Sequence, residues 1–253
     1  MKYLGGKTRI SRPLTRYLQP FVDKATAYVE PFVGGASVIC RVHHPIRYGS
    51  DSNQALITLY TALQNGWEPP SVLTEREWLE LKQKKDMLDP LTAFAGFGCS
   101  YGGMWFGSYA QDKQQTNYAT LARNALLDKK SGFSGIIWTA CDYKTINIPD
   151  KAVVYCDPPY INTAGYTAVD SFNHPVFWDW VRDLGKRATV FVSEYEAPAD
   201  INKVFSITKL LGLHPKEGNT REREECLFTP NDITDIQLRK TKPVGFISRR
   251  ASI

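Results

Sequence analysis

The chain alternates short apolar runs, which stop abruptly at turn-forming residues, with segments of helical character. Residues 152–156 end at two prolines, residues 28–30 are followed by proline, and residues 46–50 are followed by aspartate. β-Branched and aromatic runs of this length are typical of buried strands. Further strands are predicted at residues 136–138 and 189–193, with a closing hairpin from residues 206–208 and 225–229.

Helical patterns lie between these predicted strands. Apolar residues recur at helical spacing from Leu56 to Leu63. Thr74, with Glu77 three residues later, forms a capping-box signature for a helix that continues to about Lys85. Helices are also predicted at residues 118–127 and 176–184. The alternation of strands and helices predicts an α/β protein with a doubly wound sheet.

A break in this alternation follows residue 64. Asn-Gly and then Pro-Pro dipeptides occur within residues 65–70, and such dipeptides mark turns and boundaries. We therefore predict a catalytic domain formed by residues 1–69 and 136–253. A small, mainly helical insertion at residues 70–135 would divide it in sequence.

One segment of the insertion has an unusual composition. Residues 96–109 hold five glycines and five aromatic residues among fourteen, a mixture that excludes a regular helix. The segment suits a hairpin or mobile loop that offers stacking faces. It equally suits a glycine-rich structural hairpin whose aromatic side chains cover the core.

The candidate chemistry is concentrated in Asp157-Pro158-Pro159-Tyr160, directly after the strand predicted at residues 152–156. Open α/β sheets bind ligands at the carboxyl ends of their strands. This loop would present there a carboxylate, a carbonyl and an aromatic ring. An exocyclic amino group on a planar base needs such acceptors and such a stacking face. The alternative is an ordinary turn that ends a strand.

A second set of candidate residues follows the first predicted strand. The paired glycines Gly34 and Gly35 allow the backbone to approach a ligand closely. Asp51 ends the next predicted strand, about 20 residues after Glu30, a distance that suits a carboxylate binding ribose hydroxyls. A glycine turn followed by an aspartate helix cap is the alternative.

These motifs occur in the order seen in one enzyme family. Their order resembles that of Dam-type DNA adenine-N6 methyltransferases, which form the D12 class or alpha group. The motifs are Tyr3-Leu4-Gly5-Gly6-Lys7, residues 30–35, residues 50–53 and residues 157–160. The resemblance extends from residue 1 to about residue 230 and is thinnest in the insertion. It implies a Rossmann-like S-adenosylmethionine-dependent methyltransferase sheet with an inserted target-recognition domain.

The resemblance also implies roles for individual residues. The residues expected to hold the flipped adenine and support catalysis are Asp157, Pro158, Pro159 and Tyr160. Those expected around S-adenosylmethionine are Tyr3, Lys7, Glu30, Pro31, Phe32, Gly34, Gly35, Asp51 and Asp157, with Asp142 and Tyr143 added because they follow the strand at residues 136–138. No metal is expected in this chemistry.

Double-stranded DNA is the expected partner. A net charge of +5 and a pI near 8.8 are compatible with a polyanion. The residues expected to contact DNA are Lys82, Lys85, Tyr101, Met104, Trp105, Phe106 and Arg221. Dam proteins commonly carry Tyr-Asn-Gly-Leu-x-Arg-Tyr-Asn in the recognition hairpin, and in the matching stretch Phe106 replaces the arginine and Gly102 the asparagine. Because phenylalanine cannot pair with guanine as arginine does, strict GATC recognition is not expected.

The overall composition excludes several other classes of protein. The 253 residues are 43% hydrophobic and 23% charged, as in soluble globular proteins. An apolar run that could span a membrane and a secretory h-region are both missing. The five cysteines contain no CxxC pair, which argues against a disulfide framework or a zinc site. We expect a cytoplasmic monomer.

Two alternatives for the function stay open. One is another amino-methyltransferase, acting on cytosine N4, an RNA base or a glutamine side chain; the aspartate before Pro158, by resemblance, favours adenine. The other is a non-catalytic DNA-binding protein that retains the fold, although intact motifs at residues 34–35 and 157–160 argue against loss of activity. The motifs do not distinguish a bacterial source from a phage or prophage source.

Overall fold

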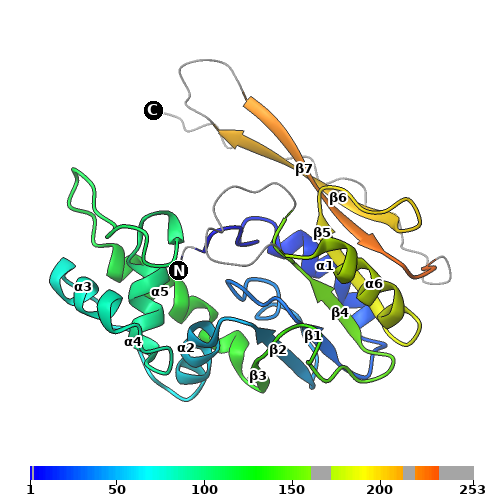
Figure 1. Cartoon of the computed structure of the whole chain (residues 1–253), viewed down its shortest axis with the longest axis horizontal. Coiled ribbons are helices and arrows are strands. Elements are labelled where there is room, and N and C mark those ends of the chain that lie inside the picture. The colour runs from blue at the N-terminus through cyan, green and yellow to red at the C-terminus, as the bar shows by residue number, and fades with distance from the viewer. Residues whose placement is uncertain (2, 161–171, 213–219, 234–253) are drawn as a thin grey trace.

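The computed structural model describes residues 1, 3–160, 172–212 and 220–233. These residues form a seven-stranded sheet of order β3-β2-β1-β4-β5-β7-β6, with helices around it (Figure 1). The strands are β1 (Tyr28–Glu30), β2 (Arg47–Asp51), β3 (Ile136–Ala140), β4 (Val153–Cys156), β5 (Thr189–Glu194), β6 (Asn202–Gly212) and β7 (Thr220–Thr229).

The sheet is parallel from β3 to β5 and closes with an antiparallel hairpin. β7 pairs antiparallel with both β5 and β6, in agreement with the hairpin predicted near the carboxyl terminus. The α-helices are α1 (Ser11–Val22), α2 (Gln54–Gln64), α3 (Glu75–Lys84), α4 (Pro90–Ala93), α5 (Tyr118–Lys130) and α6 (His174–Gly185). The predicted α/β class with a Rossmann-like sheet is confirmed.

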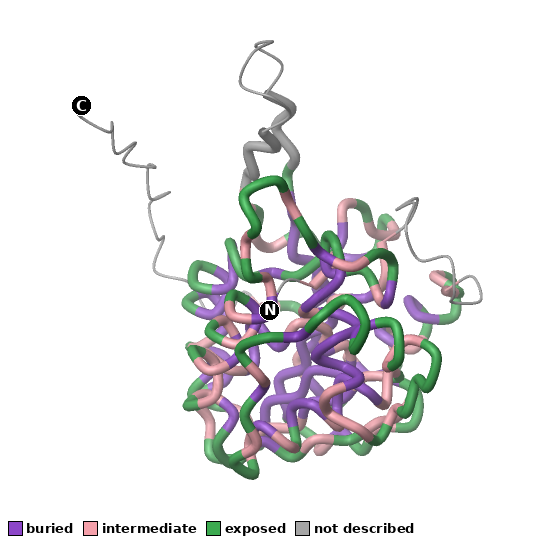
Figure 2. Tube along the Cα trace, turned by 90° about the vertical axis from the view of Figure 1, so that its left-hand side faces the viewer, coloured by how far each residue is buried: buried purple, intermediate pink, exposed green. Residues whose placement is uncertain are grey.

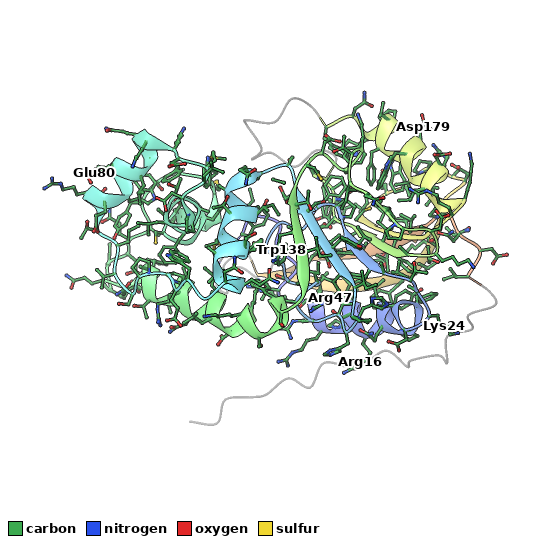
Figure 3. All side chains as sticks on the ribbon, turned by 90° about the horizontal axis from the view of Figure 1, so that it is seen from below. Arg16, Lys24, Arg47, Glu80, Trp138 and Asp179 are labelled. Atoms are coloured by element: carbon green, nitrogen blue, oxygen red, sulfur yellow. The ribbon has the colours of Figure 1, made fainter. Side chains whose placement is uncertain are left out.

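Alternate residues of the central strands face opposite sides of the sheet. Val153 and Tyr155 belong to the apolar cluster that includes α1 and α2, whereas Val154 and Cys156 belong to the cluster that includes α6. Figure 3 accordingly shows α1 and α6 on opposite sides of the sheet. Because both faces are covered, the strands read as continuous apolar runs, which is why they were visible in the sequence.

The strand order of the sheet reverses between the adjacent central strands β1 and β4. β1 is followed outward by β2 and β3 on one side, while β4 and β5 extend the sheet on the other. The chain therefore reverses its strand order between β1 and β4. In open α/β sheets a crevice at such a point, beyond the carboxyl ends of the strands, is the usual place for a ligand.

The predicted insertion is a helical lobe beside the sheet, at the left of Figure 1. Its helices are α3, α4 and α5, and α3 begins with the capping box formed by Thr74 and Glu77. Trp78, Phe94 and Leu126 of this lobe belong to the same apolar cluster as α2. The lobe therefore shares its core with the sheet domain, and Figure 2 shows a largely buried centre under an exposed periphery. Domain boundaries at residues 70 and 135 stay a prediction.

Two local features were not predicted from the sequence pattern. Helix α1 was not predicted; it buries Leu14, Leu18 and Phe21, and contains Pro20 near its end. The start of residues 96–109 belongs to a π-helical turn, Phe94–Gly98, and the segment contains one isolated β-bridge, between Ser100 and Tyr109.

Within the described ranges, no helix is both long and apolar enough to cross a membrane.

Candidate active site

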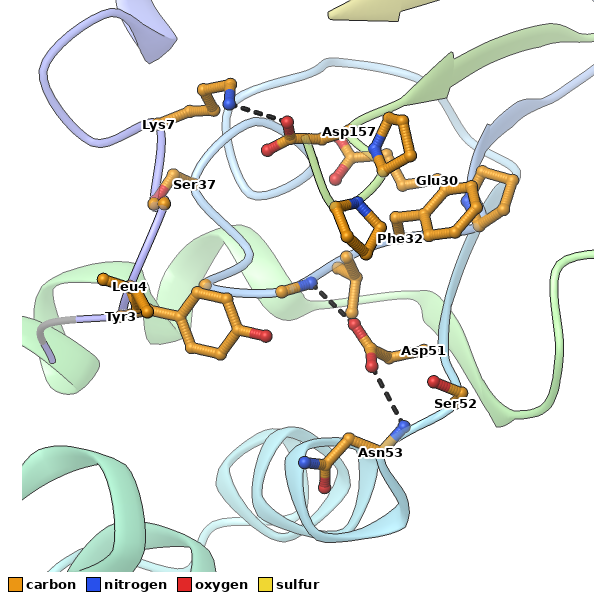
Figure 4. A pocket seen from close by; sticks show the side chains of 18 of the residues that line it. Tyr3, Leu4, Lys7, Glu30, Phe32, Ser37, Asp51, Ser52, Asn53 and Asp157 are labelled. Atoms are coloured by element: carbon orange, nitrogen blue, oxygen red, sulfur yellow. Dashed lines mark hydrogen bonds and ion pairs between the residues drawn. The ribbon is translucent and has the colours of Figure 1, made fainter. Parts of the chain in front are cut away.

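A cavity of about 660 Å³ lies beyond the carboxyl ends of β1, β2 and β4 (Figure 4). Its walls include every residue predicted for catalysis or cofactor binding. These are Tyr3, Lys7, Glu30, Pro31, Phe32, Gly34, Gly35, Asp51, Asp142, Tyr143, Asp157, Pro158, Pro159 and Tyr160. The two motif sets, more than 100 residues apart in the chain, thus meet because β1 and β4 are neighbours in the sheet. Their individual roles remain predictions.

The glycine turn after β1 is required by a close contact with Tyr3. Gly34 has a φ of +43°, and a Cβ built there would lie 2.9 Å from Cε1 of Tyr3. Tyr60 of α2 also holds the turn, because its hydroxyl donates to the carbonyl of Gly34 at 2.6 Å. A side chain at this position would displace the Tyr3 ring, which stands in the cavity wall.

Asp51 is held at the end of β2 by two backbone groups. Its Oδ2 accepts from the amide of Gly34 at 2.9 Å, and its Oδ1 accepts from the amide of Asn53 at 3.0 Å. Burial raises the pKa of the Asp51 carboxyl, and these hydrogen bonds oppose that rise. The cap of α2 is Asn53, which accepts from Ala55, so the alternative of Asp51 as the helix cap is wrong.

Glu30 is a second buried acid at this edge of the sheet. It is 2% exposed, and the hydroxyl of Tyr28 donates to its Oε1 at 2.6 Å. Burial raises the pKa of Glu30 to about 8, while the Tyr28 hydrogen bond acts in the opposite direction. At neutral pH the carboxyl group of Glu30 is therefore mostly protonated in the folded protein.

Lys7 lies in the cavity wall between two carboxylates. Its Nζ is 2.6 Å from Oδ1 of Asp157 and 2.9 Å from Oε1 of Glu225, and it also donates to the hydroxyl of Tyr160. Burial opposes the charge of Lys7, but the two carboxylates overcome this effect and raise its pKa. Burial likewise raises the pKa of Asp157, with Lys7 opposing the rise. The predicted cofactor residue Lys7 thus directly contacts the predicted catalytic loop.

Glu225 was missed in the sequence. It is 4% exposed on β7, and it accepts a hydrogen bond of 2.9 Å from the hydroxyl of Tyr160. It belongs to the acidic and basic run at residues 221–225, which resembles an exposed strand end. Nothing in that local pattern indicates that one of its glutamates lies opposite Asp157.

An aromatic group closes the cavity on the α6 side of the sheet. The ring of Phe32 lies 5.2 Å from that of Tyr143 and 5.9 Å from that of Phe172, measured between centroids. All three line the cavity. Asp142, the other residue predicted after β3, is exposed beside Tyr143. Residues 161–171, which follow Tyr160 in the sequence, lie outside the described residues.

The predicted DNA contacts differ in accessibility. Met104 and Trp105 line the cavity, and Tyr101 is 64% exposed nearby in the chain. Phe106 is 4% exposed and packs against Trp78 and Trp105, with ring centroids 5.5 and 4.8 Å away. The ring of Phe106 therefore belongs to the core in this structure, and the expected contact of Phe106 with DNA stays a prediction.

The basic residues predicted to contact DNA lie on different elements. Lys85 is exposed at the end of α3, whereas Lys82 is partly buried and its Nζ lies 4.8 Å from the centre of the Trp78 ring. Arg221 lies on β7, but its side chain is outside the described residues. DNA contact by Lys82, Lys85, Tyr101 and Arg221 stays a prediction.

Comparison with known proteins relates the amino-terminal part of the chain to one enzyme family. A sequence model of the D12 class N6 adenine-specific DNA methyltransferases matches residues 3–88, which contribute Tyr3, the glycine turn and Asp51 to the cavity. Among solved structures, the rRNA methyltransferase aviRa from Streptomyces viridochromogenes aligns with 90% of this chain and 86% of its own at 13% identity. Its TM-score of 0.37 is too low to carry an argument. Residues 3–88 are therefore similar to the D12 class N6 adenine-specific DNA methyltransferases, and this match covers less than half of the chain.

Proposed function

We propose that the protein transfers a methyl group from S-adenosylmethionine to N6 of an adenine extruded from double-stranded DNA. The observation that carries this proposal is the cavity at the strand-order reversal. Asp51 and the glycine turn form one part of its wall, and Asp157 with Tyr160 forms another. A donor and an acceptor base placed in one cavity would meet in a defined orientation, and such proximity alone lowers a reaction barrier substantially.

The residues present fit the proposed cofactor. S-adenosylmethionine, when bound, supplies an electrophilic methyl group on a positively charged sulfur. Three acids, Glu30, Asp51 and Asp157, line the cavity. Burial keeps Glu30 mostly protonated at neutral pH, so Asp51 and Asp157 are the acids that would favour a cationic ligand. Asp51, fixed by two backbone amides, would accept from ribose hydroxyls, and Phe32 and Tyr143 would offer apolar faces to an adenine ring.

Asp157 and Pro158 would activate the target amino group. The lone pair of an adenine amino group is delocalised into the ring, so the group is a poor nucleophile. Hydrogen bonds from its two hydrogens to the Asp157 carboxylate and the Pro158 carbonyl favour a more tetrahedral nitrogen. Asp157 also stabilises the positive charge that develops on that nitrogen, which is electrostatic preorganisation. Tyr160 would stack on the extruded base.

The test is methyl incorporation into DNA. Purified protein is incubated with methyl-labelled S-adenosylmethionine and unmethylated duplex DNA, and the DNA is digested to nucleosides and analysed by mass spectrometry. N6-methyladenine is expected. N4-methylcytosine, or no label in the DNA, would contradict the proposal. Asp179→Asn is the control variant, since Asp179 is 78% exposed on α6.

Cofactor binding is tested separately, without DNA. S-adenosylmethionine is titrated into the wild type and into Asp51→Ala by calorimetry. The substitution removes the carboxylate that would accept from the ribose hydroxyls, so binding should weaken by about 1.5–3 kcal/mol, the usual value of a hydrogen bond to a charged group. The loss of the acceptor for the amides of Gly34 and Asn53 would lower stability instead. Equal affinities in two folded proteins would contradict a cofactor role for Asp51.

A further inference from the structure

Lys7, Asp157, Tyr160 and Glu225 form a buried charged cluster beside the cavity. These residues come from the amino-terminal segment, the loop after β4, and β7. Lys7 and Glu225 are 4% exposed, so their charges are largely shielded from water. Removing charged side chains from water is costly, and each buried charge must be paired for the cost to be offset. Loss of one member of this cluster would therefore leave another buried charge without its partner.

The contacts within the cluster connect Glu225 to both predicted catalytic groups. An ammonium group has three N–H donors, and the three oxygens around Lys7 belong to Asp157, Glu225 and Tyr160. Oε1 of Glu225 accepts from Lys7 at 2.9 Å and from the Tyr160 hydroxyl at 2.9 Å. Glu225 therefore fixes Lys7, which contacts the acceptor carboxylate, and the ring that would stack on the base.

The charges of the cluster give Glu225 a second effect. One lysine faces two carboxylates, so the sum of their formal charges is −1 when all three are ionised. Without Glu225, Lys7 would neutralise Asp157 and the sum would be zero. A negative surplus beside the target nitrogen stabilises the positive charge that develops there, because Coulomb interactions are strong in a buried site.

We infer that Glu225 is a positioning residue for methyl transfer: it holds Lys7 and Tyr160 in place and preserves the negative charge of the Asp157 site. This inference rests on the proposed function. Glu225 does not need to touch cofactor or base in this role. It acts through Lys7 and Tyr160 from a strand that carries none of the motifs recognised in the sequence.

The experiment compares two substitutions at neighbouring positions of β7. Glu225→Gln keeps the shape and an acceptor oxygen but removes the charge. Glu224→Gln is the matched control, because Glu224 is exposed and pairs with Lys203 at 2.9 Å. Both proteins are assayed for methyl incorporation over a range of pH, with S-adenosylmethionine affinity and thermal stability measured on the same samples.

We expect Glu225→Gln to lower kcat by about tenfold or more, with cofactor affinity changed less than about twofold. Glu224→Gln should match the wild type. Glu225→Ala, which also removes the acceptor, should lower kcat further. Combining Tyr160→Phe with Glu225→Gln should cost less than the sum of the two, because both remove the same contact.

The pH profile separates a positioning role from a merely structural one. The negative charge of Glu225 raises the pKa of Asp157. Its removal lets Asp157 ionise at lower pH, so the acid limb of the profile should move to lower pH. The groups that face Asp157 and set the rest of its titration are Lys7, Glu30, Tyr155, Cys156 and Tyr160.

Two results would overturn the inference. The first is a Glu225→Gln enzyme with the kcat and pH profile of Glu224→Gln. The second is a loss of kcat that follows a loss of thermal stability, with the acid limb unmoved. A wild-type protein that transfers no methyl group to adenine would instead refute the proposed function itself, so the two failures are distinguishable.

Discussion

The carboxyl edge of the sheet and the segment at residues 94–109 both line the cavity, but different forces hold them. At the edge, Asp51 is fixed by backbone amides and Lys7 lies between two carboxylates. In the segment, Trp105 packs against Phe97 and Phe106, with centroids 4.6 and 4.8 Å away. The edge thus places charged groups where burial disfavours them, whereas the segment gains stability from apolar contact.

This difference indicates how mutations in the two regions should behave. Substitutions in the aromatic segment should change the free energy of unfolding. Substitutions at the edge should change binding, rate or pH dependence with a smaller effect on folding, since groups that serve chemistry are often not placed for stability. Substitutions in both regions can test this difference between effects on stability and effects on activity.

Phe106→Ala should destabilise the protein by about 3–5 kcal/mol, the usual range for truncating a buried phenylalanine. Urea unfolding measures the change, and Tyr101→Ala is the control because Tyr101 is 64% exposed. Tyr101→Ala should lie within about 0.5 kcal/mol of the wild type. If both variants are equally stable, packing of Phe106 does not hold the segment.

Asp157→Ala should lower kcat by about 10²–10³-fold or more, equivalent to about 3–4 kcal/mol, while the protein stays folded and binds S-adenosylmethionine. It removes both the charge and an acceptor for the amino group. Asp157→Asn separates these, since it keeps an acceptor oxygen. Single-turnover methylation gives the rate, and turnover within tenfold of the wild type would assign the role to another group.

Tyr160→Ala should weaken capture of the base by about 1–3 kcal/mol through lost stacking. Tyr160→Phe keeps the ring but removes the hydroxyl that contacts Lys7 and Glu225, so a smaller loss is expected. Fluorescence of 2-aminopurine at the target position reports extrusion. Equal losses for the two variants would mean that the hydroxyl, and not the ring, carries the function.

Glu30 should make stability depend on pH. Its pKa rises from 4.5 to about 8 through burial, so between these values the unfolded chain releases a proton that the folded chain keeps. The stabilisation is present below pH 4.5 and is lost as pH rises through 8, by at most about 1.4 kcal/mol per pH unit. Melting of wild type and Glu30→Gln from pH 5 to 9 measures it, and parallel curves would contradict it.

The local pattern was sufficient for most elements and for the motif residues that line the cavity. Strands β1, β4 and β5 are buried on both faces, so their apolar runs stand out, and Thr74 with Glu77 predicted the start of α3 correctly. The residues at 30–35, 51 and 157–160 were recognisable because each directly ends or follows a predicted strand and occurs in a short motif of fixed order. Every one of these motif positions lines the cavity.

Contacts between distant segments were not predictable in the same way. The composition of residues 96–109 left open whether the rings face DNA or the core, and only the packing against Trp78 places Phe106 inside. Lys7 belongs to a recognisable motif, but its contact with Asp157 joins two segments that are 150 residues apart in the chain. The folded chain alone brings these segments together.

The sequence by itself determined the α/β class and the two motif loops, because these depend on residue type and short-range order. Tertiary structure alone decided that Glu225 joins Lys7, Asp157 and Tyr160, and that Phe106 is buried. The physical reason is that burial and electrostatic pairing are properties of neighbours in space. Glu225 and Lys7 are separated by more than 200 residues in the chain and meet only when β7 inserts beside β5.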